Sequence, residues 1–177
     1  MNSRLASLLF TVMFIIVPTC LAQSDPKKVS KPPAAELEKF KPFLGDYAGN
    51  YSEAKWAYNT GFKSAVGGWY VEFFFLTNTE GIDRELRMLM TYDTKQKKYR
   101  VWRFETLAPL PQLEGELRFE GDEIVMEWKM AEFRGKTGTF RNRYKMTTKD
   151  DLEIITEFQQ QDGKLESLGT LKAKRKA

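Results

Sequence analysis

The sequence predicts an all-β protein, a single antiparallel up-and-down β-barrel of about nine or ten strands with one short N-terminal helix. Apolar and polar residues alternate from Leu44 onward, and successive side chains on a strand point to opposite faces. Short turn signals separate the alternating runs, so each strand should run antiparallel to its chain neighbours. Such a meander exposes two edges unless it closes, and closure into a barrel removes both.

The first 22 residues are typical of a secretory signal peptide. Arg4 carries positive charge, Leu8 to Val17 is a largely apolar run of ten residues that is too short to span a bilayer, and Cys20-Leu21-Ala22 offers cleavage after Ala22. The alternatives are a short membrane anchor and lipoprotein processing at Cys20, which the bulky Thr19 disfavours. We therefore expect a secreted or periplasmic protein with no stable membrane insertion after cleavage.

Cleavage after residue 22 of the 177-residue chain leaves 155 residues, enough for one domain with a sizeable core. Residues 23–33 (QSDPKKVSKPP) are polar and rich in Pro, which predicts a flexible leader. We expect the barrel domain over 34–174 and a basic tail over 175–177. The net charge of +4 is mild and the basic residues gather at the two ends, which indicates solvated ends rather than a nucleic-acid partner.

The residues that the chain lacks exclude several chemistries. Cys20 is the only Cys and falls in the signal, and the chain contains no His. The mature protein therefore has no disulfide, no thiolate or imidazole metal site, and no nucleophile that depends on His or Cys. Carboxylates remain as a catalytic engine, for example Glu72 with Glu116 or Glu127, but no spacing selects such a pair. We expect a protein that is not an enzyme and that holds no cofactor or metal.

Residues 34–43 (AAELEKFKPF) form the one predicted helix. Leu37, Phe40 and Phe43 fall on one face at a spacing of three, and Pro42 is expected to end the helix. The helix is too short to build a core, so we expect it to cover another part of the protein.

Four segments alternate clearly between an apolar face and a mostly polar face. These segments are Leu86–Tyr92, Ile124–Met130, Phe140–Met146 and Leu152–Phe158. The last two are expected to form a hairpin with a solvated outer face, in which opposite charges pair across the strands. The expected pairs are Arg141, Arg143 and Lys145 opposite Glu153, Ile155 and Glu157. Turns are predicted at Asn59–Gly61, Thr79–Gly81, Asp93–Lys95, Glu120–Asp122, Arg134–Lys136, Lys149–Asp151 and Asp162–Gly163.

The segment GGWYVEFFFLTN, residues 67–78, is apolar on both faces of a strand. One face carries Trp69, Val71, Phe73 and Phe75, and the other carries Tyr70, Glu72, Phe74 and Leu76. One face should line the barrel interior. The other should be covered, either by the helix face of residues 37–43 or by another subunit.

Several segments in order carry a family resemblance. They are PFLGDYAGNY, GGWYVEFFF, MTYDTKQKKYRVWRFE, a Gly-bounded strand with a central Trp, and DGKLESLGTLKAKR. In this order they resemble the bacterial domain-of-unknown-function family numbered fifteen seventy-nine, over residues 37–174. The most specific matches are Tyr92, Asp93, Lys98, Tyr99 and Trp102 in one motif, and Gly67, Gly68, Trp69 and Glu72 in the other.

The resemblance implies a calycin-like fold, similar to lipocalin and fatty-acid-binding barrels, and it implies no activity. Calycins usually carry Trp after Gly on the first strand, where this chain has Tyr47. This departure bears on kinship with true lipocalins more than on membership of the family.

Glu72 is the centre of the predicted site. If the face with Tyr70 and Phe74 points inward, the carboxylate needs a cationic partner, and Arg is the natural one. Arg87, Arg100 and Arg103 are the candidates, and Arg100 shares a face with Trp102 and Phe104, which favours it as the inward one. The alternative is that Glu72 faces solvent or closes a structural ion pair. The predicted ligand-binding residues are Tyr70, Glu72, Phe74, Arg87, Arg100, Trp102 and Trp128.

Two hypotheses about function follow from a barrel of this size. A hollow interior would bind a small apolar or amphiphilic ligand, whereas an interior filled by the many aromatic and Met side chains would leave an interaction or structural module. The second hypothesis predicts a homodimer or another stable partner, through the aromatic strand or the loop Thr106–Gln112. That loop (TLAPLPQ) is apolar and stiff, so it is either folded over one end of the barrel or a lid or portal for the ligand.

Overall fold

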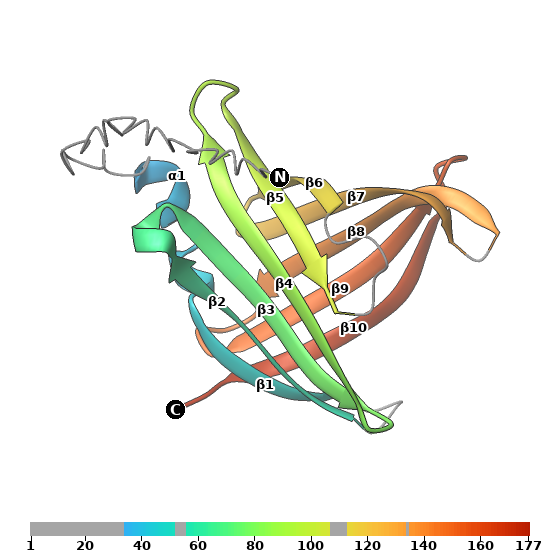
Figure 1. Cartoon of the computed structure of the whole chain (residues 1–177), viewed down its shortest axis with the longest axis horizontal. Coiled ribbons are helices and arrows are strands. Elements are labelled where there is room, and N and C mark those ends of the chain that lie inside the picture. Colours follow the sequence, from blue (N-terminus) through green and yellow to red (C-terminus); the bar gives the residue numbers. More distant parts are fainter. Residues whose placement is uncertain (1–33, 52–55, 107–112, 134) are drawn as a thin grey trace, which may run out of the picture. The chain divides into compact units, whose positions relative to one another are not determined.

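Ten antiparallel strands close into a barrel in the computed structural model, which describes residues 34–51, 56–106, 113–133 and 135–177 (Figure 1). The strands are β1 (Gly45–Tyr51), β2 (Trp56–Ala65), β3 (Tyr70–Thr79), β4 (Ile82–Asp93), β5 (Lys98–Glu105), β6 (Leu113–Glu120), β7 (Glu123–Phe133), β8 (Lys136–Met146), β9 (Asp151–Gln160) and β10 (Leu165–Arg175). Each strand pairs with its neighbours in the chain, and β1 pairs with β10 to close the ring. The predicted fold class is confirmed.

The inner face of the wall follows the alternation that the sequence predicts. Met88 and Met90 on β4, Met126 on β7 and Tyr144 on β8 are buried. The β8–β9 hairpin has the predicted register, in which Arg141 lies opposite Glu157 and Lys145 lies opposite Glu153. The predicted charge pairs across this hairpin are wrong, because the ion pairs of these cations go to Glu127 and Glu123 on β7. A period of two, combined with short turns, therefore sufficed to place these side chains.

The predicted turn at Asn59–Gly61 is wrong, because these residues lie in the middle of β2. Thr60 is buried, and its hydroxyl donates a hydrogen bond to the carbonyl oxygen of Phe74 at 2.7 Å. A Cβ on Gly61 would collide with the carbonyl oxygen of Gly45 and with the Phe74 ring. The glycine therefore serves a close approach of backbone and ring inside a sheet, where sequence reasoning expected a reversal of the chain.

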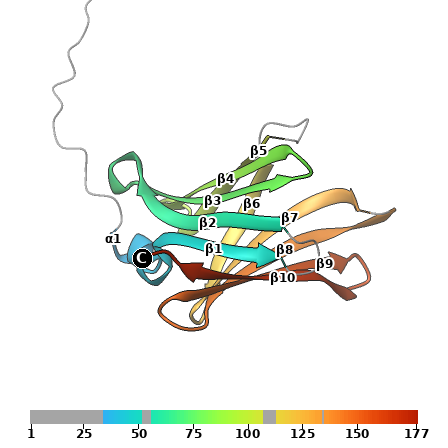
Figure 2. The same cartoon turned by 90° about the horizontal axis from the view of Figure 1, so that it is seen from below.

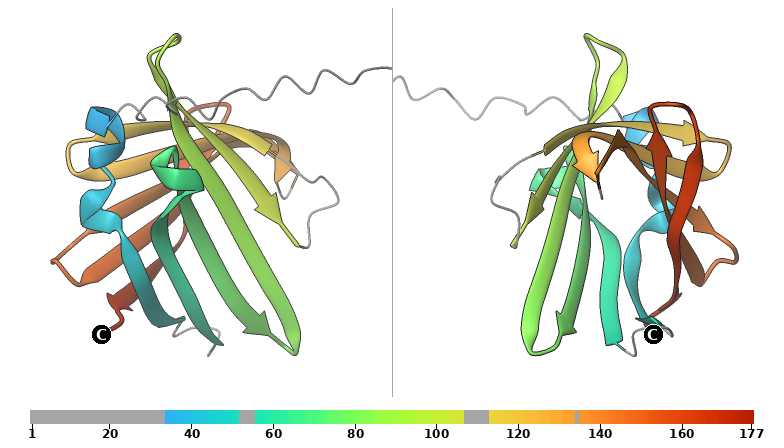
Figure 3. Two further views of the ribbon diagram at one scale, coloured as in Figure 1. Left: turned by 60° about the vertical axis from the view of Figure 1, so that its left-hand side comes forward. Right: turned by 90° about the vertical axis from the view of Figure 1, so that its right-hand side faces the viewer.

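The predicted helix is divided into two short pieces, α1 (Ala34–Glu38) and the 3₁₀ helix η1 (Lys41–Phe43). Pro42 lies in the first turn of η1, where its missing N–H costs nothing, so it takes part in a helical turn instead of ending one. A further 3₁₀ turn, η2 (Val66–Gly68), joins β2 to β3. Figures 2 and 3 show α1 and η1 at one end of the barrel.

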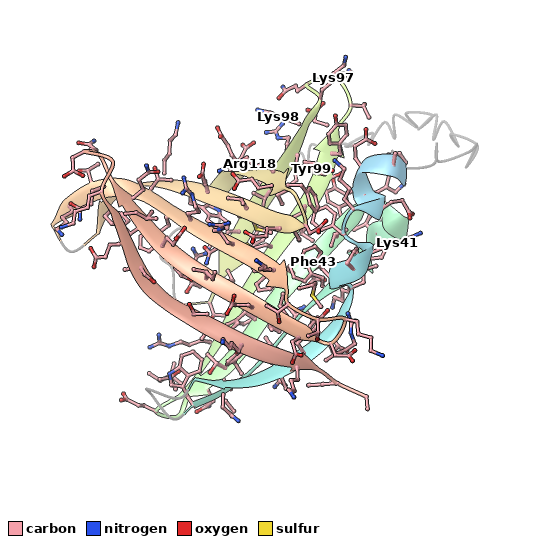
Figure 4. The ribbon with its side chains drawn as sticks, turned by 180° about the vertical axis from the view of Figure 1, so that it is seen from behind. Lys41, Phe43, Lys97, Lys98, Tyr99 and Arg118 are labelled. Carbon is pink, nitrogen blue, oxygen red and sulfur yellow. The ribbon has the colours of Figure 1, made fainter. Side chains whose placement is uncertain are left out.

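The helical pieces α1 and η1 close one end of the barrel. The expectation that the helix covers the outward face of the aromatic strand is therefore wrong. Phe40 and Phe43 are 0% and 2% exposed. The Phe40 ring packs edge-on against Tyr99 at 5.9 Å and Phe119 at 5.0 Å between centroids. In Figure 4, Phe43 and Tyr99 lie on the inner side of this cap and Lys41 on its outer side. We call this the capped end.

Arg175, with which the predicted basic tail began, is the last residue of β10. Its guanidinium donates hydrogen bonds to the carbonyl oxygens of Leu44, Pro42 and Lys149, and it lies 4.8 Å from the centre of the Tyr47 ring. This arginine therefore links the last strand, β10, to the segment that precedes the first strand, β1. The predicted signal peptide and leader, residues 1–33, lie outside the described residues.

Candidate functional site

The interior is filled in the half next to the cap. Phe62, Phe73 and Tyr144 form a triangle of rings whose centroids are 4.9 to 5.6 Å apart. Tilted and edge-on arrangements of this kind are the favourable ones for aromatic pairs. Tyr99 adds a hydrogen bond, because its hydroxyl donates to the carbonyl oxygen of Glu36 at 2.8 Å. Burial raises the pKa of Tyr99 to about 12, so this hydroxyl keeps its proton at any physiological pH.

The other half of the interior holds a cavity of about 290 Å³. Its apolar walls include Trp56, Phe73, Phe75, Met88, Phe140 and Leu171. Thr79 and Arg84, at the β3–β4 turn, also line it, and Arg84 is exposed, so the cavity reaches the surface at the end opposite the cap. We call this the open end. The barrel is therefore filled at one end and hollow at the other, which combines the two alternatives that the sequence left open.

An ion pair on β5 supplies charge inside the cavity. Arg103 and Glu105 are two residues apart on the inner face, and Arg103 Nη2 lies 2.6 Å from Glu105 Oε2. The guanidinium carbon of Arg103 lies 5.8 Å from the centre of the Trp128 ring, which is a cation–π contact with a buried indole. Arg103 Nε is buried and has no hydrogen-bond acceptor among the described residues.

Several other polar groups that line the cavity have hydrogen-bond partners. Asn142 Nδ2 donates to Thr156 Oγ1 at 2.9 Å, and Thr77 Oγ1 donates to the carbonyl oxygen of Ala57 at 2.9 Å. At the rim, Glu85 Oε1 accepts a hydrogen bond from Arg87 Nε at 2.5 Å. Burial raises the pKa of the Tyr144 hydroxyl, an effect that the positive charge of Arg103 only partly offsets. Tyr144 therefore lines the cavity as a neutral group.

Six of the seven predicted ligand-binding residues lie on the outer wall. Glu72 Oε1 accepts from Arg87 Nη1 at 2.5 Å, and its other oxygen lies 3.3 Å from Lys63 Nζ. The Phe74 ring lies between the same two cations, at 5.7 Å from Arg87 and 5.6 Å from Lys63. Glu72 therefore closes a structural ion pair, the alternative that the sequence left open, and Arg87 is its partner.

The remaining outward residues form a second cluster on β3 and β5. Arg100 pairs with Glu114 and lies 5.4 Å from the centre of the Trp102 ring. Trp102 in turn contacts Tyr70 at 6.4 Å. The expectation that Arg100 and the face it shares with Trp102 point inward is wrong, and the face with Tyr70 and Phe74, whose direction the sequence left open, points outward. Trp128 alone points inward, where it is 1% exposed and lies beneath Arg103.

The sequence names Arg103 as a candidate but favours Arg100 as the inward arginine, because Trp102 and Phe104 make the face of Arg100 apolar. The register of β4 and β5 shows which arginine points inward. The Asp93–Lys98 turn places Met90 opposite Val101 and Met88 opposite Arg103. Because Met88 and Met90 belong to an apolar face, counting from the turn assigns Arg103 to the interior. Glu105 follows two residues later on the same face.

The carboxylates considered for catalysis do not share a cavity with Glu72. Glu116 and Glu127 are neighbours across β6 and β7, and Glu127 accepts hydrogen bonds from Arg118 and Arg141 at 3.1 and 2.7 Å. Within the described part of the chain, no group of three or more His, Cys, Asp or Glu side chains is placed to hold a metal ion. Of the described helices, none has the length and apolar character needed to cross a bilayer. The loop predicted as a lid or portal lies outside the described residues, apart from Thr106.

The fold and the cavity define the class of this protein as a closed, ten-stranded up-and-down barrel with an internal cavity. The family follows from comparison with family models. The model described as "Protein of unknown function (DUF1579)" matches residues 46–175, and the chain belongs to this family. The match runs from β1 to the last residue of β10, so it covers the whole barrel and confirms the resemblance seen in the sequence.

One solved structure shows the same fold. The crystal structure of Rv2717c from M. tuberculosis is similar to this chain with a TM-score of 0.53 and 15% sequence identity, and the alignment covers 82% of this chain and 98% of that chain. At this identity the likeness concerns the fold alone. No curated protein matches the chain.

Proposed function

We propose that this protein binds one small apolar or amphiphilic molecule in the cavity at the open end. The observation that carries the proposal is the contrast inside one barrel, since aromatic rings fill one half and leave about 290 Å³ in the other. Small-molecule sites have volumes of roughly 300 to 1,000 Å³, mostly apolar walls and a few polar groups that fix orientation. The cavity lies at the lower limit of this range and has both kinds of lining.

We also propose that the protein acts outside the cytoplasm. The pattern of residues 1–22 supports this, because a charged start, an apolar run of ten residues and small residues at Cys20 and Ala22 are the parts of a secretory signal. The mass of the protein recovered from a culture that expresses the full chain tests the proposal. A mature chain that begins at Gln23 is expected, and a mass that includes the first 22 residues would contradict it.

Binding in the cavity is tested with a neutral fluorescent dye and two matched variants. Leu171→Trp places an indole in the cavity, whereas Leu76→Trp places one on the outer wall of β3. We expect the first to weaken dye binding about tenfold or more, because the cavity has little spare volume, and the second to leave binding unchanged. Thermal melts check that both variants fold. Equal affinities in the two variants would place the dye outside the cavity.

The alternative function, an interaction module, has less support from the outer wall. Its most aromatic part has Phe74, Trp102 and Tyr70 in contact with cations or with one another. These contacts account for the rings without a partner protein. Among the aromatic rings of β3 and β5, only Phe104 has a large free surface, at 37% exposed.

A further inference from the structure

We propose that the ligand carries an anionic head group of the carboxylate type on a single apolar chain, and that Arg103 recognises it. This inference rests on the proposed binding function and adds the chemical class of the ligand. It follows from the charges inside the cavity, from the hydrogen bonds that Arg103 makes, and from the ion pair between Arg103 and Glu105.

The first step is the distribution of charge. Four charged side chains line the cavity, namely Arg84, Glu85, Arg103 and Glu105. Each carboxylate has an arginine partner, since Glu105 pairs with Arg103 and Glu85 pairs with Arg87. Arg84 has no carboxylate within ion-pair distance among the described residues. The four charges that line the cavity sum to zero, but the one charge without an ion-pair partner among the described residues is the positive charge of Arg84, at the rim through which a ligand would enter.

The second step compares possible head groups. A cationic ligand would have to take a carboxylate from its arginine and leave a guanidinium unpaired in a partly buried site, which is costly. An anionic ligand displaces only Glu105, whose side chain is 33% exposed and can turn toward solvent, and it also meets Arg84, which has no carboxylate partner among the described residues. A neutral ligand can also accept hydrogen bonds from a guanidinium, but it lacks the two charged oxygens that match the planar fork.

The third step concerns the unused capacity of Arg103. A guanidinium has five N–H donors in a planar fork that matches the two oxygens of a carboxylate. The one hydrogen bond of this side chain to a described residue uses Nη2 and goes to Glu105. The side chain is 24% exposed, so part of it faces the cavity, and Trp128 holds it from beneath. Arg103 is therefore held in place and has donors to spare.

The fourth step is that the carboxylate of Glu105 already occupies part of the place beside Arg103 where a ligand carboxylate would bind. Glu105 approaches Arg103 at 2.6 Å, and its side chain is 33% exposed, so it can turn toward solvent. An entering carboxylate would replace Glu105 as the partner of Arg103, and the apolar chain would lie against Phe75, Trp56 and Leu171. Glu105 then acts as an internal competitor that keeps the arginine paired when the cavity is empty.

The test compares ligands that share one chain and differ in the head group. Calorimetric titrations at neutral pH would use decanoate, decanol, decyl phosphate and decyltrimethylammonium. For the wild type we expect decanoate to bind about tenfold or more tighter than decanol, as expected for hydrogen bonds to a charged group. Decyltrimethylammonium should bind more weakly than decanol. A preference for decyl phosphate over decanoate would overturn the carboxylate assignment.

Variants on one strand separate recognition from folding. Arg103→Met should reduce the decanoate-to-decanol ratio to about one, whereas Arg100→Met, on the outer face of the same strand, should leave it unchanged. Arg103→Lys, which keeps the charge but loses the planar fork, should give an intermediate ratio and covers the case in which Arg103→Met does not fold. Glu105→Gln should strengthen decanoate binding, because the competing charge is gone.

The outcomes distinguish this inference from the proposed function. If decanol binds in the cavity but decanoate has no advantage, or if Arg103→Met and Arg103→Lys both keep the full advantage, the inference is overturned and the binding function stands. If none of the four ligands binds, the binding function fails and the inference fails with it.

Discussion

The two ends of the barrel are built from the same ten strands but differ in what their inner faces carry. On β9, Leu152 is buried toward the cap, Ile154 is buried at the base of the cavity, and Thr156, two residues further along, lines the cavity. On β8, Tyr144 is buried at the base of the cavity, and Asn142, two residues away on the same face, lines it as well. Polar side chains at Asn142 and Thr156, where the capped half has larger inward side chains, therefore help to separate a core from a binding site within one interior. Stability and function can be assigned to different ends.

The largest expected effect tests the division between core and cavity on β3. Phe73→Ala should lower the free energy of unfolding by about 3 to 5 kcal/mol, because Phe73 is 2% exposed and packs against two other rings. Phe75→Ala should cost clearly less, because both rings line the cavity but Phe75 is only half-buried. Urea denaturation followed by tryptophan fluorescence measures both. Similar losses in the two variants would mean that the two ends do not differ in packing.

A second, smaller effect should be confined to the capped end. Arg175→Met removes hydrogen bonds from a guanidinium to the carbonyl oxygens of Leu44, Pro42 and Lys149, and we expect a loss of about 1.5 to 3 kcal/mol. Hydrogen exchange should become faster over η1 and the start of β1, while dye binding at the open end stays unchanged. Weaker dye binding in this variant would show that the two ends are coupled.

The smallest expected effect lies on the outer wall, which belongs to neither end. Hydrogen bonds from Arg118 lower the pKa of Glu127 below its ordinary value of 4.5, desolvation opposes this, and Arg141 adds to the lowering. A carboxyl with a lowered folded-state pKa contributes stability that is fully present above its unfolded pKa. That contribution is lost as the pH falls from 4.5 toward the folded value. Melts between pH 6 and pH 3 should therefore fall less steeply for Glu127→Gln than for the wild type, and equal slopes would contradict this account.

The sequence predicted the barrel and most of its inner face because each strand has a simple period and each turn has its own chemistry. The predictions of a turn and of a helix end were wrong at residues whose type has two structural roles. Gly61 and Pro42 look like chain breakers, but one allows a close backbone approach and the other fits the first turn of a short helix. Composition cannot separate these uses, because tertiary contacts decide between them.

The candidate site was harder to predict for a related reason. β3 and β5 carry aromatic residues on both faces, so hydrophobicity did not show which face is inside. On the outer face, cations above Phe74 and Trp102 make exposure of the rings tolerable. On the inner face, Arg103 and Glu105 neutralise each other, which makes their burial tolerable. Only the strand register, counted from the Asp93–Lys98 turn, resolves the choice.

The seam between β1 and β10 has a consequence for how the molecule is made. The last pairing of the ring joins Tyr47 to Arg175, two residues separated by nearly the whole domain. Contacts of such long sequence separation form slowly, because the intervening chain must first be brought together. Until residue 175 is available, β1 and β9 each present an unpaired edge. The barrel therefore cannot close until its last strand has been synthesised, so late folding is a property of the topology itself.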